Sequence, residues 1–287
     1  MMHGMSDGPY SALADAHLPG DLAQRWTALL RPCARLRRAD AGEAVVAVLG
    51  GAPHLPARVA WPAWPGHGPL SFIASVRCAA LPQDGLGEEF PQDGTLLFFY
   101  FDVGLVEVVC VDDTETWAGA QVLYVPENTP VFPAETPPVL EPYPRVELTA
   151  EIEQSAPDLW LPQARRVLLG DTRAWPSRRR DTPGELAAFV RAFARLRTRI
   201  DHQIGGHACP LQGPVEYEIA DATLTERHEW GDPALDEEAE RWVLLAQFTG
   251  DHETDMMWGG EGVLYWLVRP DDLAARRFDQ VRLVIQT

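Results

Sequence analysis

The acidic segment from Asp251 to Asp255 carries three carboxylates and one imidazole. Carboxylate oxygens are preferred ligands of Ca²⁺ and Mg²⁺, so Asp251, Glu253 and Asp255 are the candidate metal ligands of this chain. The segment is not an EF-hand loop, because it lacks the glycine expected at the sixth position and the glutamate expected at the twelfth. A solvated hairpin loop is the favoured interpretation, with a metal site as the alternative.

A zinc site or a catalytic centre has less support. His202, His207 and Cys209 lie close in the sequence, but zinc sites need three or four suitably spaced ligands, and no second Cys/His pair completes this set. His202 directly follows a predicted helix, where an imidazole can bind the last carbonyl groups. The sequence contains no GxSxG elbow and no HExxH pattern. We therefore expect no cofactor, and a binding protein rather than an enzyme.

The elements that must position these residues follow from the apolar pattern. A helix is predicted from Asp21, and a longer one from Thr182, where Thr182, Pro183 and Glu185 combine three signals of a helix start. Short helices are expected at 233–241 and 271–277. Strands are predicted at 45–49, 70–76, 95–101, 106–111, 122–125, 145–153, 215–219, 243–248, 263–268 and 281–286.

The order of these signals repeats along the chain. Gly50-Gly51 is echoed by Gly205-Gly206, and the apolar strands that follow each pair are alike. The sequence thus predicts an α+β fold built from two related strand-rich halves, with a few packed helices. Residues 1–43 would form a helical extension, and the halves would span 44–144 and 145–287. A chance similarity of short apolar strands is the alternative.

The charge balance restricts the partners. The formal net charge is −18 and the pI is near 4.8, which argues against nucleic acid and anionic membranes and leaves a basic protein as the expected partner. Background composition would explain the same acidity. The sequence shows neither a membrane-length apolar run nor a secretory signal, and its four cysteines form no CxxC pair. We expect a cytoplasmic protein with reduced thiols.

Three segments together resemble a known family. They are Gly50-Gly51-Ala52-Pro53-His54-Leu55-Pro56 with Trp61-Pro62, His202-Gln203-Ile204-Gly205-Gly206 with Pro210 and Gln212, and Asp255-Met256-Met257-Trp258-Gly259-Gly260 with the strand that follows. Over about residues 44–287 the chain resembles the YwqG-like family of bacterial domains. The resemblance implies a strand-rich α+β fold and brings no established activity, cofactor or catalytic residue. An association of some relatives with toxin loci suggests an immunity role.

A ligand-binding cleft between the halves is one reading of these motifs. Proteins similar to this one tend to carry glutamine both at the position of Ser75 and at that of Gln247, which would make such a cleft asymmetric here. Tryptophan side chains beside paired glycines suit an apolar cleft, although most tryptophans are expected in the core. The candidate ligand-binding residues are Trp61, His202, Gln247 and Trp258.

Two functions therefore compete. The leading hypothesis is a non-enzymatic binding protein of unknown ligand, in its specific form an acidic immunity protein that neutralises a basic toxin. The alternative is a small-molecule or metal-binding enzyme whose site lies in the cleft between the two halves.

Overall fold

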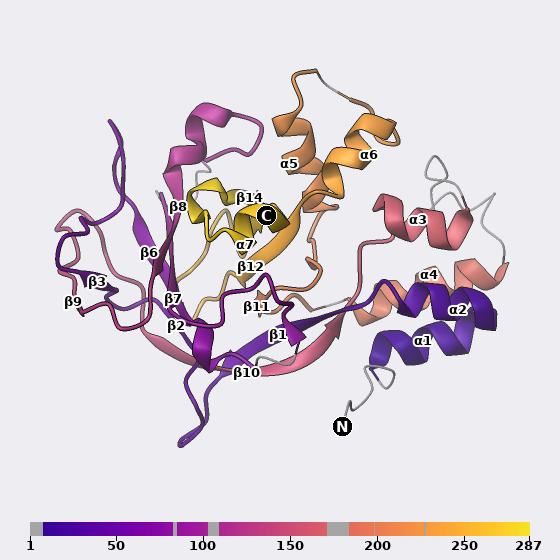
Figure 1. Ribbon diagram of the computed structural model, residues 1–287, viewed down its shortest axis with the longest axis horizontal. Helices are drawn as coiled ribbons and strands as arrows, with labels where there is room; N and C mark the ends of the chain where they lie inside the picture. Colours follow the sequence, from indigo (N-terminus) through magenta and orange to yellow (C-terminus); the bar gives the residue numbers. More distant parts are fainter. Residues whose placement is uncertain (1–7, 83–84, 103–108, 171–183, 198, 227) are drawn as a thin grey trace.

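Ten strands form one continuous antiparallel sheet (Figure 1). The structure is a computed structural model that describes residues 8–82, 85–102, 109–170, 184–197, 199–226 and 228–287. In the order in which they pair, the strands are β14 (Arg282–Gln286), β13 (Val263–Val268), β12 (Val243–Thr249), β11 (Gln203–Ile204), β1 (Arg31–Arg38), β10 (Val146–Ser155), β2 (Ala47–Leu49), β6 (Ser71–Arg77), β7 (Thr95–Tyr100) and β8 (Ala120–Val125). Two small ribbons accompany the sheet: β3 (His54–Pro56) with β9 (Val131–Pro133), and β4 (Ala63–Trp64) with β5 (Gly68–Pro69).

The sheet curls until its two ends share one core. Phe98 of β7 lies 5.1 Å from Phe248 of β12 and 5.4 Å from Trp266 of β13, measured between ring centroids. At the rim, Tyr124 of β8 stacks on Phe278, which begins the 3₁₀ turn Phe278–Gln280 ahead of β14. The natural twist of strands permits this curvature, and large buried aromatic side chains stabilise it.

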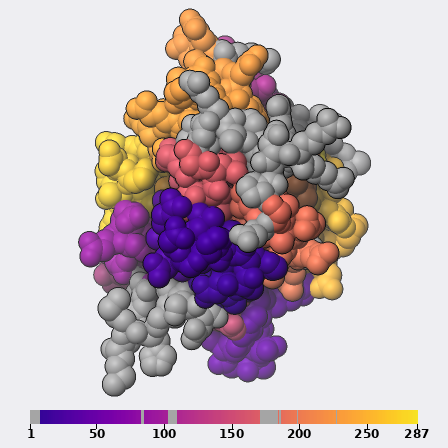
Figure 2. All heavy atoms as spheres, turned by 90° about the vertical axis from the view of Figure 1, so that its right-hand side faces the viewer, coloured from indigo at the N-terminus to yellow at the C-terminus, as the bar shows by residue number. Residues whose placement is uncertain are grey.

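Four helices form a separate bundle at one side of the sheet (Figure 1). They are α1 (Pro9–His17), α2 (Gly20–Thr27), α3 (Pro162–Leu169) and α4 (Gly184–Leu196). Trp26 is their central residue, with its ring 5.1 Å from Phe189 and 5.7 Å from Phe193. Figure 2 shows α1 and α2 at the centre of this face, with α3 directly above them.

Three further helices accompany the last strands. They are α5 (Val215–Thr223), α6 (Pro233–Ala239) and α7 (Pro270–Ala274). Val215 and Ile219 of α5 pack against the face of β12, β13 and β14 that points away from Phe98. Among the residues that the structure describes, we find no helix with the length and apolar character needed to cross a lipid bilayer.

The predicted α+β fold of two related strand-rich halves is wrong. All ten main strands belong to one sheet, and the part of the chain that the structure describes shows no internal duplication. The sheet is continuous because residues 31–38, which we assigned to a helical extension, form β1. This strand pairs with β10 from Arg31↔Ser155 to Arg38↔Leu148 and on its other side with β11. Its sequence, rich in arginine, carries no clean alternation that would have indicated a strand.

Most of the individual strands were predicted correctly. Those expected at 70–76, 95–101, 243–248, 263–268 and 281–286 appear as β6, β7, β12, β13 and β14. The long helix appears as α4, although Thr182 and Pro183 of its predicted start lie outside the described residues. Residues 106–108 of the strand expected at 106–111 lie outside them as well, and residues 109–111 form no strand. The strand expected at 215–219 is wrong, because these residues form helix α5.

Candidate functional site

Two of the predicted ligand-binding residues, His202 and Gln247, make backbone hydrogen bonds. Gln247 is fully buried on β12, where its Oε1 accepts from the backbone N–H of Cys209 at 3.0 Å and its Nε2 donates to the carbonyl of Asp201 at 2.8 Å. The Nδ1 of His202 accepts from the backbone N–H of Thr249 at 3.1 Å, and burial lowers the pKa of this imidazole to about 4. Both side chains hold neighbouring backbone in place.

The other two, Trp61 and Trp258, are packing residues. Trp258 is 2% exposed and belongs to the main core. Trp61 is partly buried, donates from Nε1 to the carbonyl of Leu70 at 2.8 Å and packs its ring edge-on against Phe99. His202 directly precedes β11, whose Gln203 pairs with Gln247 of β12, but none of the four residues lines the cavity described below.

The acidic segment is a turn whose carboxylates are engaged by an arginine. Asp251 forms a bridge with Met256, and the guanidinium of Arg38 lies 2.7 Å from Glu253 and 3.5 Å from Asp251. Asp255 is exposed, at a positive φ of 58°. Within the described ranges, no group of three His, Cys, Asp or Glu side chains could hold a metal ion.

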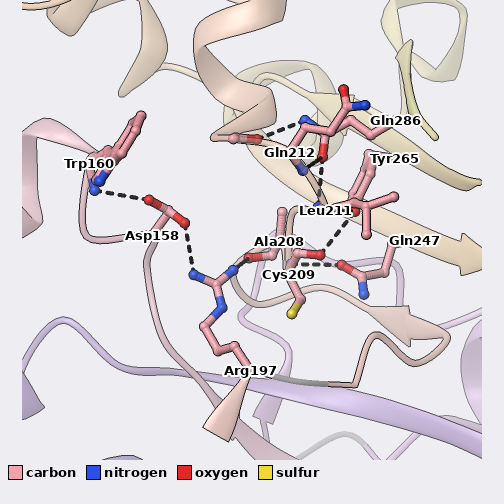
Figure 3. Close-up of polar contacts among 11 residues, drawn as sticks. Asp158, Trp160, Arg197, Ala208, Cys209, Leu211, Gln212, Gln247, Tyr265 and Gln286 are labelled. Atoms are coloured by element: carbon pink, nitrogen blue, oxygen red, sulfur yellow. Dashed lines mark hydrogen bonds and ion pairs between the residues drawn. The ribbon is translucent and has the colours of Figure 1, made fainter. Parts of the chain in front are cut away.

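A buried polar network fixes the loop between β11 and α5 (Figure 3). Tyr265 donates from Oη to the carbonyl of Cys209 at 2.9 Å and accepts from the N–H of Leu211 at 3.1 Å. The Oε1 of Gln286 accepts from the N–H groups of Leu211 and Gln212 at 2.8 and 3.0 Å. Together with Gln247, these side chains provide hydrogen-bond partners for backbone N–H and carbonyl groups of a loop that is not paired with a strand.

The start of the same loop needs a glycine. Gly206 has a φ of 72°, and a Cβ at this position would lie 2.5 Å from the Oγ of Ser155 and 2.7 Å from the Cβ of Cys33. Because Gly206 has no side chain, the backbone lies close to Ser155, and the N–H of His207 donates to the Oγ of Ser155 at 2.8 Å. His207 is thereby directed toward the helical bundle.

A cavity of about 340 Å³ opens beside His207, between the bundle and the last strands. We call it the Glu216 cavity. Its walls come from the α2–β1 connection, α3, the Gly206–His207 turn, α5 and the region from the end of α6 to β12. The lining residues are Ala28, Leu29, Arg31, Gln163, Gly206, His207, Glu216, Ala239, Glu240, Trp242, Val243 and Leu244.

Two residues of the lining each carry a buried acceptor oxygen that has no hydrogen-bond partner among the described residues: Oε2 of Glu216 and Oε1 of Gln163. Glu216 is only 6% exposed, and burial raises the pKa of its carboxyl from 4.5 to about 7. Near neutral pH the group can therefore act as an acid or as an anion. A carboxyl of this kind in a concave site is a recognised mark of function.

His207 adds a third polar group with a defined protonation state. Its Nε2 lies 2.8 Å from the carbonyl of Leu29, which can only accept, so Nε2 carries the proton and Nδ1 is an acceptor. Burial lowers the pKa of His207 to about 3, which keeps the ring neutral. The guanidinium of Arg31, an exposed residue of the lining, supplies the positive charge of the site.

Residues 47–287 match the family described as "Domain of unknown function (DUF1963)". The chain belongs to this family. A search of curated proteins gives no match. The DUF1963 match begins at the first residue of β2, so α1, α2 and β1 precede it. One wall of the Glu216 cavity, Ala28, Leu29 and Arg31, is therefore supplied by residues that precede the DUF1963 match.

Sequence reasoning missed both Gln163 and Glu216. The alternation of Val215, Glu216, Tyr217, Glu218 and Ile219 indicated a strand. The signals that could have corrected this are Pro214 at the helix cap and the acidic residues in the first turn. Nothing in the sequence around Gln163 marks it as a cavity residue.

Proposed function

We propose that this protein is a non-enzymatic binding protein that holds a small polar molecule in the Glu216 cavity. The observation that carries the proposal is that two lining residues of one cavity, Glu216 and Gln163, each carry a buried acceptor oxygen with no partner among the described residues. A buried acceptor without a partner costs about 1 to 3 kcal/mol, so a ligand that offers N–H or O–H groups to both oxygens would gain that energy on binding.

The size of the cavity supports a small organic ligand. About 340 Å³ is far more than one water molecule requires and falls within the range of small-molecule sites, which begins near 300 Å³. Trp242 and Leu244 offer apolar contact area, while Arg31 adds a cation that a ligand carboxylate would bind. Small amines, amides and amino acids combine these features.

The experiment is a thermal-shift series with small amines, carboxamides and amino acids on the wild-type protein and on Glu216→Gln, Gln163→Leu and Glu237→Gln. Glu237 is exposed on α6 and does not line the cavity, which makes it the matched control. We expect some of these compounds to raise the melting temperature of the wild type and of Glu237→Gln but not of the two cavity variants. Equal shifts in all four proteins, or none in any, would contradict the proposal.

A second function, binding of a basic protein, is favoured by the net charge of −18. An immunity protein against a basic toxin is its specific form. Attraction between exposed charges is screened over about 8 Å near physiological salt, so the association rate with such a toxin should fall as salt rises. A partner that binds at a rate independent of salt would argue against this form.

We further propose that the chain is a YwqG-like member of its family and acts in the cytoplasm. The glycine-rich segments at 50–56, 202–206 and 255–260 support the first assignment. Buried thiols support the second: Cys33 and Cys78 are buried, and burial raises their pKa values to about 11 and about 12, which keeps both thiols protonated and unreactive. Cell fractionation of a tagged protein tests the compartment.

A further inference from the structure

A second cavity, of about 270 Å³, lies on the opposite part of the sheet. Its floor consists of side chains that share one face of β2, β6 and β7, where Val48 pairs with Ser75 and Ser75 with Leu97. The loop from Gly50 to His54 and the strand β9 form its wall, and Figure 1 shows the β3–β9 ribbon at this outer side of β6. We call it the Arg145 cavity.

The lining combines apolar side chains with positive charge. Val48, Phe72, Leu97, Val125 and Val131 supply the apolar surface. Among the described residues, the titratable members of the lining are His54, Arg77 and Arg145, with neither an aspartate nor a glutamate. The chain as a whole has 42 acidic and 24 basic residues and a net charge of −18, so the basic character of this lining is opposite in sign to that of the whole protein.

Arg145 is held over the cavity by a glycine. Gly51 has a φ of 71°, and a Cβ at this position would lie 3.1 to 3.3 Å from Cβ, Cγ and Cδ of Arg145. The aliphatic part of the Arg145 side chain therefore packs directly against the Gly51 backbone. Its guanidinium lies 2.7 Å from Glu147, but both side chains are about half exposed, and such surface pairs contribute little. A ligand anion can therefore compete for this guanidinium.

Arg77 stands beside Thr95 at the edge of the same face. One nitrogen of its guanidinium donates to the carbonyl of Val45, which anchors the side chain, and no carboxylate among the described residues forms an ion pair with it. Two guanidinium groups at an apolar cavity suit an anionic head, such as a carboxylate, attached to a hydrocarbon chain.

We propose that the Arg145 cavity binds an aliphatic carboxylate of medium chain length, with its chain against Leu97 and Val48 and its head at Arg145 and Arg77. The modest volume, slightly below the usual range for larger ligands, favours a chain of about eight carbons over a long fatty acid. The proposal does not depend on the Glu216 cavity, whose lining shares no residue with this one.

The test is isothermal titration of the purified full chain with octanoate, hexanoate and 1-octanol. A buried methylene contributes about 0.8 kcal/mol, so octanoate should bind about fifteenfold more tightly than hexanoate. Charge-assisted hydrogen bonds contribute about 1.5 to 3 kcal/mol, so Arg145→Gln and Arg77→Gln should each weaken octanoate binding about tenfold or more. Arg58→Gln, an exposed arginine outside the lining, is the matched control and should bind as the wild type does.

Three outcomes would overturn the proposal: no octanoate binding, equal affinity for octanoate and 1-octanol, or octanoate affinity that both arginine variants retain. Ser75→Phe provides a second measurement, because Ser75 lies on the cavity floor and a phenyl ring there would fill it. A variant that keeps the wild-type circular dichroism spectrum should lose octanoate binding. If it keeps the affinity, the ligand binds elsewhere.

Discussion

The backbone N–H of Cys209 donates to Oε1 of Gln247 at 3.0 Å, so a side chain on β12 fixes the loop that leads from β11 to α5. The same glutamine donates to the carbonyl of Asp201 on the other side of β11. Gln247 therefore spans the strand it pairs with and holds the backbone at both ends. Its hydrogen-bonding groups are occupied within the protein, which accounts for a buried glutamine in an otherwise apolar strand.

Replacing Gln247 by leucine should lower the free energy of unfolding by about 2 to 4 kcal/mol, because it leaves one buried N–H and one carbonyl without partners. Urea denaturation at neutral pH measures the change. Gln121→Leu is the control, since Gln121 is only partly buried and its amide reaches two exposed carbonyls. A stable Gln247→Leu variant with a loss of ligand affinity would instead restore Gln247 as a binding residue.

The carboxyl of Glu216 should make stability depend on pH. Its pKa is about 7 in the folded protein against 4.5 ordinarily, so the folded state binds more protons between these values. The free energy of unfolding should therefore decrease as pH rises through this window, by about 3 kcal/mol from this group. Glu216→Gln should remove that decrease.

Urea denaturation at pH 5 and pH 8 checks this expectation on the wild type, Glu216→Gln and Glu237→Gln. The advantage of Glu216→Gln over the wild type should be about 2 to 3 kcal/mol larger at pH 8 than at pH 5. The exposed Glu237→Gln control should follow the wild type. Parallel behaviour of Glu216→Gln and the wild type would mean that Glu216 is hydrated in the folded state.

Trp258→Ala should cost about 3 to 5 kcal/mol of stability, because the side chain is 2% exposed in the main core and its removal leaves a cavity. Phe132→Ala, at a 56% exposed position on β9, should change stability by no more than about 0.5 kcal/mol. Thermal and urea denaturation compare the two. A stable Trp258→Ala variant with weakened ligand or partner binding would place Trp258 in a functional cleft.

Millimolar Ca²⁺ or Mg²⁺ should leave the melting temperature unchanged, since Arg38 already engages the carboxylates of Glu253 and Asp251. Differential scanning fluorimetry with and without EDTA measures this. A rise with Ca²⁺ that disappears in Asp251→Ala or Asp255→Ala would establish the predicted metal site. Arg38→Ala tests whether the arginine itself keeps such a site closed.

The sequence predicted the positions of strongly apolar strands well, but it did not predict how the strands pair in the sheet. β13, and β7 after its first residue Thr95, are apolar throughout and were predicted closely, because both faces of the curled sheet are buried there. β1 was missed because its register depends on partners in β10 and β11, far along the chain. The glycine repeats suggested two halves, but only long-range pairing determines how many sheets form.

The candidate site was even less accessible to sequence reasoning. Glu216 falls in a pentapeptide that alternates like a strand, and tertiary packing places it in a helix with its carboxyl buried. The tryptophans chosen for their chemical types pack in the core or against it, and the chosen histidine accepts from a backbone N–H. A cavity is the space left between segments that are far apart in the sequence, so a local sequence pattern cannot predict it.

The central place of β1 also sets an order of events during synthesis. The carbonyl of Arg31 meets the hydroxyl of Ser155, a residue 124 positions later in the chain, and β11 follows only after the whole helical bundle has been made. β1 must therefore leave the ribosome long before either neighbour exists. Such non-local pairing slows folding and exposes unpaired strand edges to other chains. This protein should depend on chaperones more than its modest length would suggest, and a chain that started at β2 would leave the facing edges of β10 and β11 open to aggregation.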